Sequence, residues 1–242
     1  MLPRMFASPF MNLLYPPTCV LCDCRLGAPE PCVCDACERA MPRLVPPVCQ
    51  RCGVSLPGAY DALLVCHACR AQPPPFQDAR APFLYTGLVR NAIHAFKYHG
   101  HRRVGAWLAQ AMAHKHATGS TEPRYDLLAS VPMHWVKRRL KGMNPAAWLA
   151  QAVSRQLQLP HEARALRRTR WTATQTRLSR TQRARNVAGA FRASPLAVNR
   201  CRVLLIDDVF TTGATARACA TALQEAGAHH VSVLTAAIAP AP

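Results

Sequence analysis

The sequence is poor in acidic residues, in lysine and in long apolar runs. Only 12 of its 242 residues are Asp or Glu, against 30 Lys or Arg, so the formal net charge is +18. No apolar run reaches the ~18–20 residues that a membrane-spanning helix needs, and no membrane span is expected. The apolar stretch from Met5 to Tyr15 is broken by Pro9 and Asn12 and lacks a small-residue cleavage site, so no secretory signal is expected either. These absences predict a cytoplasmic protein.

The positive charge is concentrated in one part of the chain. Residues 101–192 hold 18 basic and 3 acidic residues, whereas residues 1–79 hold six of each. The densest part, residues 164–192, contains nine arginines and no acid. Genome base composition can explain why arginine outnumbers lysine 26 to 4, but it does not explain the shortage of acids. The pattern fits either a solvated basic face or a surface that binds a polyanion, and we favour the polyanion.

The composition changes near residue 75, which divides the chain into two predicted domains. Residues 1–75 are rich in Cys and Pro, and Pro73, Pro74 and Pro75 form a stiff boundary. Residues 76–242 form the second domain, in which apolar periodicity predicts helices over 88–98, 104–116, 144–157 and 215–226. Short apolar runs predict strands over 126–131, 201–206 and 231–238. This alternation predicts an α/β fold with a parallel sheet flanked by helices.

Eight cysteines of the first domain form four CxxC pairs. Two such pairs provide the four thiolates that zinc binds in a tetrahedron, so pairing along the chain predicts two structural zinc ribbons. Crossed pairing, or replacement of a ligand by Cys24, Cys32 or His67, remains open. A disulfide framework fits less well without a secretion signal, and four regular pairs do not suit one catalytic dithiol. The predicted Zn²⁺ ligands are Cys19, Cys22, Cys34, Cys37, Cys49, Cys52, Cys66 and Cys69.

The segment CRVLLIDDVFTTGAT, residues 201–215, carries the clearest sign of a ligand. A buried strand delivers Asp207 and Asp208 at its carboxyl end, and a turn rich in Thr and Gly then opens a helix. Two acids suit ribose hydroxyls and Mg²⁺, and a simple helix cap would not need them. The Walker pattern is absent, so ATP hydrolysis is not expected. The groups that can surround a phosphate belong to Thr211, Thr212, Gly213, Ala214 and Thr215.

This segment resembles the ribose-phosphate signature of type I phosphoribosyltransferases, and together with the cysteine pairs it resembles the competence protein F (ComF) family. Further stretches match that family's pattern, although Pro145 stands where a Gln is expected. The resemblance implies a type I phosphoribosyltransferase-like sheet preceded by a double zinc-ribbon module. The matching stretches are 96–98 (FKY), 131–135 (VPMHW), 139–144 (RLKGMN), 168–175, and 183–191 with its RNV triplet.

The resemblance also implies ligands, partners and roles. Phosphoribosyl pyrophosphate (PRPP) would bind with Mg²⁺, its 5′-phosphate in the turn and its ribose at Asp207 and Asp208, the candidate catalytic residues. His134, Arg139 and Lys141 would lie on the pyrophosphate side. The family acts in DNA uptake during natural transformation, which implies single-stranded DNA, a competence helicase and a recombination mediator as partners. The alternative is a metabolic phosphoribosyltransferase that acts on an unidentified base or amine.

The arginine-rich stretch is the predicted nucleic-acid surface. Trp171 lies among its arginines, and Trp135 precedes a similar basic run. An aromatic ring beside cations can stack an unpaired base while the cations pair with phosphates. No motif indicates readout of specific bases. The candidate contacts are Arg138, Arg139, Arg167, Arg168, Arg170, Trp171, Arg177, Arg180, Arg183 and Arg185.

Overall fold

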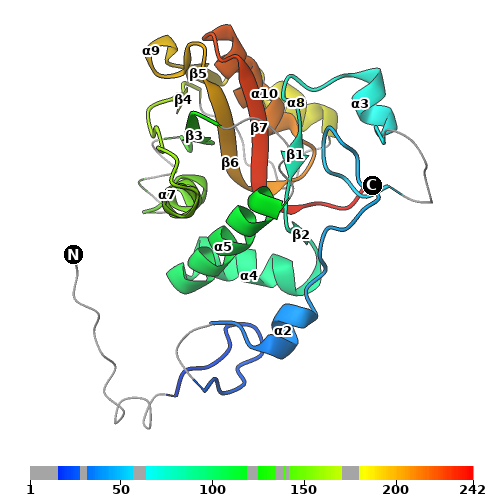
Figure 1. Cartoon of the computed structure of the whole chain (residues 1–242), viewed down its shortest axis with the longest axis vertical. Coiled ribbons are helices and arrows are strands. Elements are labelled where there is room, and N and C mark those ends of the chain that lie inside the picture. The colour runs from blue at the N-terminus through cyan, green and yellow to red at the C-terminus, as the bar shows by residue number, and fades with distance from the viewer. Residues whose placement is uncertain are drawn as a thin grey trace.

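The computed structural model describes residues 16–27, 32–56, 64–118, 125–134, 139, 142–170 and 180–241. The amino-terminal part contains two short helices, α2 (Asp35–Arg39) and α3 (His67–Ala71), as Figure 1 shows. The other elements are β1 (Ala79–Arg80), β2 (Phe83–Leu84), α4 (Gly87–Tyr98), α5 (Arg102–Thr118), β3 (Leu127–Ser130), α7 (Pro145–Leu157), β4 (Leu166–Arg168), α8 (Arg180–Val187), β5 (Phe191–Ala193), α9 (Pro195–Val198), β6 (Arg202–Phe210), α10 (Ala214–Glu225) and β7 (His230–Ile238).

A parallel sheet lies at the centre of the second part of the chain. Its strands follow the order β1-β7-β6-β3, and β2 pairs with β7 beyond β1. All pairings of this sheet are parallel. The strands β4 and β5 form a separate antiparallel pair. The predicted α/β fold with a parallel sheet flanked by helices is therefore confirmed.

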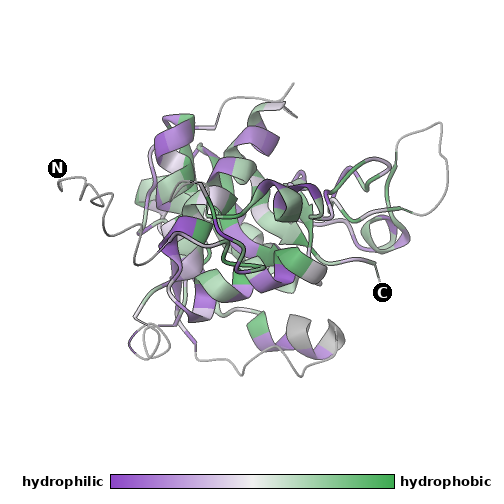
Figure 2. Cartoon of the chain, turned by 90° about the horizontal axis from the view of Figure 1, so that it is seen from below, coloured by the Kyte–Doolittle hydropathy of each residue, from purple (hydrophilic) through white to green (hydrophobic). Residues whose placement is uncertain are grey.

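Helices cover both faces of this sheet. On one face α5 packs on β7 and α7 on β6 and β3, while α4 packs against α5; on the other face α10 packs on β6 and β7 beside α8 (Figure 1). Because side chains alternate along a strand, Val203 and Leu205 of β6 belong to the core on the α10 side. Leu204 and Ile206 belong to the core under α4, α5 and α7. The helices carry both polar and apolar stretches, as Figure 2 shows.

Each ribbon of the amino-terminal part joins a different core. Cys19 and Cys37 pack with the core under α4 and α5, whereas Cys49 and Cys52 pack with the core on the α10 side. The proline-rich connection is held against α10, since the guanidinium of Arg217 donates to the carbonyl oxygens of Gln72 and Pro73 at 2.8 and 3.1 Å. Within the described ranges, no helix combines the length and the apolarity that crossing a membrane takes.

The predicted long elements match the structure to within a few residues, with one informative difference at β6. The sequence predicted a strand that ends at Ile206, yet β6 continues to Phe210. The extension arises because β7 pairs along the whole length, with Asp207 opposite Thr235 and Val209 opposite Ala237. The two acids therefore lie within the strand, whose backbone fixes their positions. The strands β1, β2, β4 and β5 were not predicted, because two or three residues carry no readable periodicity.

Candidate functional site

The second ribbon brings four thiols together. The sulfur atoms of Cys49, Cys52, Cys66 and Cys69 all lie within 4.8 Å of one another. The Cys52 and Cys66 sulfurs are 3.6 Å apart, near the roughly 3.8 Å edge of a tetrahedron with Zn–S bonds of about 2.3 Å. Backbone N–H groups of Cys66 and Cys52 donate to the Cys49 sulfur at 3.3 and 3.5 Å. Although burial opposes it, these donors lower the pKa of Cys49 to about 7 and favour the thiolate.

The first ribbon gathers five thiols where four were predicted. The sulfurs of Cys19, Cys22, Cys24 and Cys34 lie within 4.8 Å of one another, and those of Cys22 and Cys34 are 3.7 Å apart. The predicted fourth ligand, Cys37, also contacts the thiols of Cys22, Cys34 and Cys19. Its backbone N–H donates to the Cys34 sulfur at 3.4 Å and lowers the pKa of Cys34 to about 6. Exposed Cys24 and buried Cys37 are thus alternative fourth ligands.

The second cluster joins two CxxC pairs that are consecutive in the sequence, as pairing along the chain predicted, whereas the first holds Cys24 together with Cys19, Cys22 and Cys34. Among the described residues, neither Cys32 nor His67 belongs to a cluster. The donor sets are all-thiolate and four-membered, which is the chemistry of structural zinc. The amino-terminal part therefore carries two structural zinc sites, and the metal would supply the cross-link that holds each ribbon.

A crevice of about 600 Å³ opens at the carboxyl ends of β3 and β6. Open parallel sheets bind their ligands at this edge, because the loops after the strands diverge there. The chain segment after β3, the end of β6 and the start of α10 form one side, and α4 forms the other. The lining includes Tyr85, His94, Lys97, Tyr98, Val131, Pro132, Met133, Asn144, Arg168, Asp207, Asp208, Thr211 and Thr215.

The turn between β6 and α10 forms a small hollow beside this crevice. Gly213 is the N-cap of α10 and has a left-handed φ of +74°. A Cβ at this position would lie 2.6 Å from the Phe210 ring, so glycine alone fits without rearrangement. The hydroxyl of Thr212 accepts from the N–H of Ala214 at 3.4 Å. Thr211, Gly213, Ala214 and Thr215 line the hollow, at the amino end of a 12-residue helix, where an anion is favoured.

A partly buried ion pair occupies the acid end of the crevice. Lys97 of α4 places its Nζ 2.8 Å from Oδ1 of Asp208. Burial opposes the charge on Lys97, but the Asp208 carboxylate outweighs it and raises the pKa of Lys97. Burial raises the pKa of Asp207 to about 8, and the neighbouring Asp208 charge adds to the effect. Asp207 therefore holds a proton near neutral pH, and the Asp208 carboxylate pairs with the Lys97 ammonium.

No role for Lys97 followed from the sequence, although the FKY triplet containing it had been noted. Lys97 is four residues after Ile93 and directly after Phe96, both fully buried residues of α4. A single lysine at the edge of an apolar helix stripe, in a chain with few lysines, was the available signal. Its partner could not be read from the sequence, because the contact depends on how α4 packs beside β6.

The acid pair predicts opposite effects of two isosteric substitutions. Because the folded pKa of Asp207 is raised, its contribution to stability is complete below about pH 4 and is lost as the pH rises through about 8. Asp207→Asn should remove this loss and raise stability at pH 9 by about 1 kcal/mol or more, roughly 2–4 °C in Tm. Asp208→Asn removes the partner of the partly buried Lys97 and should cost about 1–3 kcal/mol.

Scanning calorimetry of the two variants at pH 5 and pH 9 measures this difference. At pH 5 the carboxyl of Asp207 is protonated in the folded chain but mostly ionised in the unfolded chain, so Asp207→Asn should raise stability less there than at pH 9. Equal shifts of Tm for both substitutions at pH 9 would show that the carboxylates do not differ in their environments.

The predicted pyrophosphate-side residues lie in different places. His134 is buried and Arg139 is exposed, and the residues lining the crevice include neither. Lys141 lies outside the described residues.

The departure from the family pattern at Pro145 has a local explanation, since Pro145 is the first residue of α7, where a missing N–H loses no helical bond. The amide of Asn144 caps this helix and also donates to the carbonyl oxygen of Val131 at 3.1 Å.

The described arginines of the basic stretch separate into two groups. Arg167, Arg170 and Arg185 are exposed, in keeping with a binding surface. Arg168 instead lines the crevice, with its guanidinium 5.4 Å from the centre of the Phe191 ring, and burial lowers its pKa. Because side chains alternate along a strand, the neighbouring side chains of β4, including that of Arg167, point away from the crevice. The side chains of Arg138, Trp171, Arg177, Arg180 and Arg183 lie outside the described part, as does Trp135.

Known proteins are similar to this chain over almost its whole length. Residues 10–70 match the double zinc ribbon domain family. The chain is 33% identical over 227 residues to the DNA utilization protein YhgH of Salmonella typhimurium, covering 91% of this chain and 96% of the relative. The Escherichia coli K12 protein of the same name has the same identity and coverage. Competence protein F of Haemophilus influenzae is 27% identical over 223 residues, 89% of this chain and 94% of the relative.

Solved structures give only a distant likeness. Glutamine PRPP amidotransferase from Bacillus subtilis, complexed with ADP and GMP, matches 53% of this chain at 22% identity with a TM-score of 0.37. The match spans 25% of that enzyme's chain. The fold assignment above rests instead on the strand order and on the helices that cover each face of the sheet.

Proposed function

Because the chain belongs to the competence protein F family, we propose that it handles incoming DNA during natural transformation, binding single-stranded DNA and PRPP. The names of its relatives, DNA utilization protein and competence protein F, support a role in DNA handling. A competence helicase and a recombination mediator are the proposed partners. We place the protein in the cytoplasm, where thiols stay reduced and available to zinc. We propose a division at residue 75/76 between the zinc module and the PRPP-binding domain.

The single observation that carries the PRPP site is the hollow at Gly213 beside the acid pair. A phosphate at the amino end of α10 would receive backbone N–H groups and the hydroxyls of Thr211 and Thr215. A ribose next to it would place its hydroxyl groups at Asp207 and Asp208. Mg²⁺ bound with the ligand would supply positive charge to the pyrophosphate. Titration of the full chain with PRPP and Mg²⁺ tests this site.

The single-strand surface is supported by two facing arginines. Arg167 of β4 lies directly opposite Arg192 of β5, and both side chains are exposed. Like charges at directly opposed positions of a strand pair destabilise it. A phosphate lying over the two arginines would remove this repulsion, so the strand pair is better suited to a polyanion than to water alone. Arg192 was not among the arginines that the sequence nominated individually.

Binding to a single strand should depend steeply on salt. If about five phosphates are neutralised, log K against log salt should have a slope of roughly −3.5. The Arg167→Gln/Arg192→Gln variant should flatten this slope by about 1.4, since two contacts are lost. Fluorescence anisotropy with a labelled oligothymidine at several salt concentrations measures both values. Arg155→Gln, at an exposed arginine, is the control. The nucleic-acid half of the proposal would fail if this control flattened the salt slope as much as the double variant. It would also fail if the wild type did not bind the oligothymidine at low salt.

The alternative function, a metabolic phosphoribosyltransferase, is favoured by the room left in the crevice. The crevice lining also includes Tyr85, His94 and Tyr98, whose aromatic rings suit a flat acceptor. In such a reaction the bond from ribose C1 to pyrophosphate breaks, a bond from C1 to the acceptor nitrogen forms, and the acceptor loses a proton. Pyrophosphate release that requires an added base or amine would favour this function; binding without release across an acceptor panel would exclude it for that panel.

A further inference from the structure

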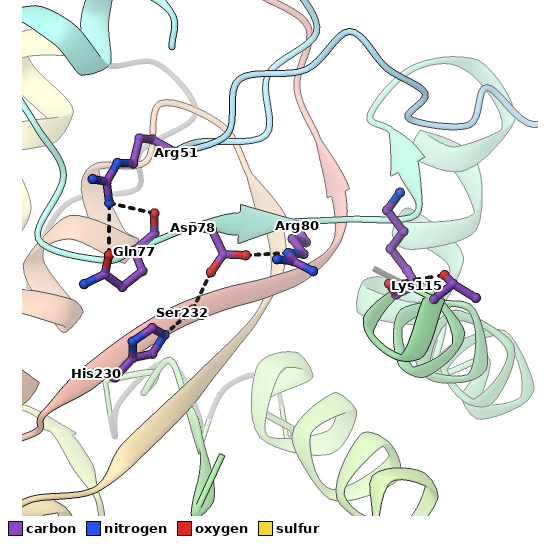
Figure 3. Close-up of polar contacts among 8 residues, drawn as sticks. Arg51, Gln77, Asp78, Arg80, Lys115, His230 and Ser232 are labelled. Atoms are coloured by element: carbon purple, nitrogen blue, oxygen red, sulfur yellow. Dashed lines mark hydrogen bonds and ion pairs between the residues drawn. The ribbon is translucent and has the colours of Figure 1, made fainter. Parts of the chain in front are cut away.

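A second cavity, of about 610 Å³, lies at the seam between the second ribbon and the edge strand β1. Residues 44–53 of the ribbon form one wall, and residues 77–81 form the other. Lys115 of α5 and His230 at the start of β7 complete it. The PRPP crevice lies at the carboxyl ends of β3 and β6, whereas the residues that line this seam cavity lie around β1, as Figure 3 shows for Arg51, Lys115 and His230. Its volume falls within the about 300–1,000 Å³ typical of ligand sites.

The one carboxylate in the seam cavity is already satisfied within the protein. Asp78 pairs through Oδ2 with Nε of Arg80 at 2.5 Å. Its Oδ1 accepts from the hydroxyl of Ser232, whose oxygen in turn accepts from Nε2 of His230 at 3.0 Å (Figure 3). Both oxygens of Asp78 are thus engaged, and the carboxylate neutralises Arg80 alone. The remaining lining charges, Arg51 and Lys115, leave the cavity with two net positive charges.

These two cations are set at opposite ends of the cavity. Figure 3 shows Arg51 near one end and Lys115 near the other, with Arg80 between them. Arg51 is fixed by the two bonds of one guanidinium nitrogen to the backbone and side-chain oxygens of Gln77, at 3.2 and 3.0 Å. Its other nitrogens remain for a ligand, because a guanidinium carries five donors. Among the described residues, no carboxylate pairs with the ammonium of Lys115.

The ribbon wall beside this row of cations is apolar. Leu44, Pro46, Val48 and Val65 line it. The ribbon backbone lies close to β1, as the position of Gly53 shows: a Cβ there would lie 2.4 Å from the carbonyl oxygen of Ala79. Cations that are separated from one another, with apolar side chains of the ribbon beside them, match a strand whose phosphates and bases point in different directions. A small inorganic anion would use neither the separation of the cations nor the wall.

We propose that the seam cavity binds a segment of single-stranded DNA, with phosphates at Arg51 and Lys115 and bases against the ribbon wall. The second ribbon then contacts DNA directly, and its zinc fixes the wall that the bases touch. This proposal rests on the proposed function, since it names a further contact of the same ligand. The site is separate from the arginines of β4 and β5, which lie beside α10.

The test compares oligothymidine binding by Arg51→Gln/Lys115→Gln and by Arg39→Gln/Arg155→Gln. The control pair removes two exposed arginines outside the cavity, so both variants lose the same charge. We expect the seam variant to bind at least tenfold more weakly and to flatten the salt slope by about 1.4, and the control to change affinity less than threefold. Arg51→Lys/Lys115→Arg should restore most of the affinity, which separates lost contacts from lost folding.

Four results would overturn the proposal. Equal weakening by the seam variant and the control would show an effect of net charge alone and would overturn it. An affinity for inorganic phosphate equal to that for oligothymidine would also overturn it, since the ribbon wall would then contribute nothing. If the wild type binds oligothymidine and the seam variant binds equally well, the seam proposal alone fails; if the wild type binds none at low salt, the proposed DNA function fails with it.

Discussion

Replacing Gly213 with valine should weaken PRPP binding by at least a hundredfold. A branched side chain at a φ of +74° is strained, and its Cβ would meet the Phe210 ring at 2.6 Å. Relief of that clash must move either the turn or Phe210, which packs edge-on against Phe76 in the core. In both cases the N–H groups at the start of α10 leave the position that a phosphate needs.

Gly189→Val is the matched control for this prediction. Gly189 also has a positive φ, +64°, but a Cβ there would meet nothing within 4 Å. It carries the same backbone strain without touching the turn, so its PRPP affinity should stay within about threefold of the wild type. Calorimetry with PRPP and Mg²⁺ measures both variants. Equal losses in the two would attribute the effect of Gly213→Val to strain alone.

Loss of the second zinc should have the largest effect on stability. Structural zinc contributes about 10–16 kcal/mol in small ribbons, far more than a typical core contact. Cys52→Ser should therefore reduce the zinc content from two to one per chain and unfold the second ribbon. Because Cys49 and Cys69 pack in the core on the α10 side, the Tm of the whole chain should also fall. Cys201→Ser, outside both clusters, should retain two zinc ions.

Zinc content also decides the role of the fifth thiol in the first ribbon. If Cys24 and Cys37 are alternative ligands, Cys24→Ser and Cys37→Ser should each retain two zinc ions, and the double variant should retain one. Atomic absorption on the purified chains provides the count. If only one of the two single variants loses a zinc ion, the cysteine replaced in that variant is the fourth ligand and the other cysteine does not bind zinc.

The sequence was most informative where one local segment carries the whole signal. Periodicity located the long helices and a short apolar run located β6, and the turn at Gly213 was identifiable because its residues are contiguous. The CxxC spacing located both thiol clusters for the same reason. The first cluster differed in one respect, since the position of Cys24 follows from the three-dimensional path of the ribbon and not from spacing.

Contacts between distant segments could not be predicted in this way. The Lys97–Asp208 ion pair depends on how α4 lies beside β6, and Arg168 reaches the crevice because β4 alternates its sides. Composition grouped Arg168 with the arginines predicted to bind DNA, although its surroundings differ from those of Arg167 and Arg170. The seam cavity depends on the docking of the ribbon onto β1, a two-residue strand that no pattern reveals.

The direct test of the crevice is calorimetric titration of the zinc-loaded chain with PRPP and Mg²⁺. We predict saturable binding of one PRPP per chain, and at least a hundredfold loss in Asp207→Asn/Asp208→Asn with oligothymidine binding retained. A folded wild-type chain that holds two zinc ions and takes up no PRPP would contradict the assignment of this crevice to a sugar phosphate.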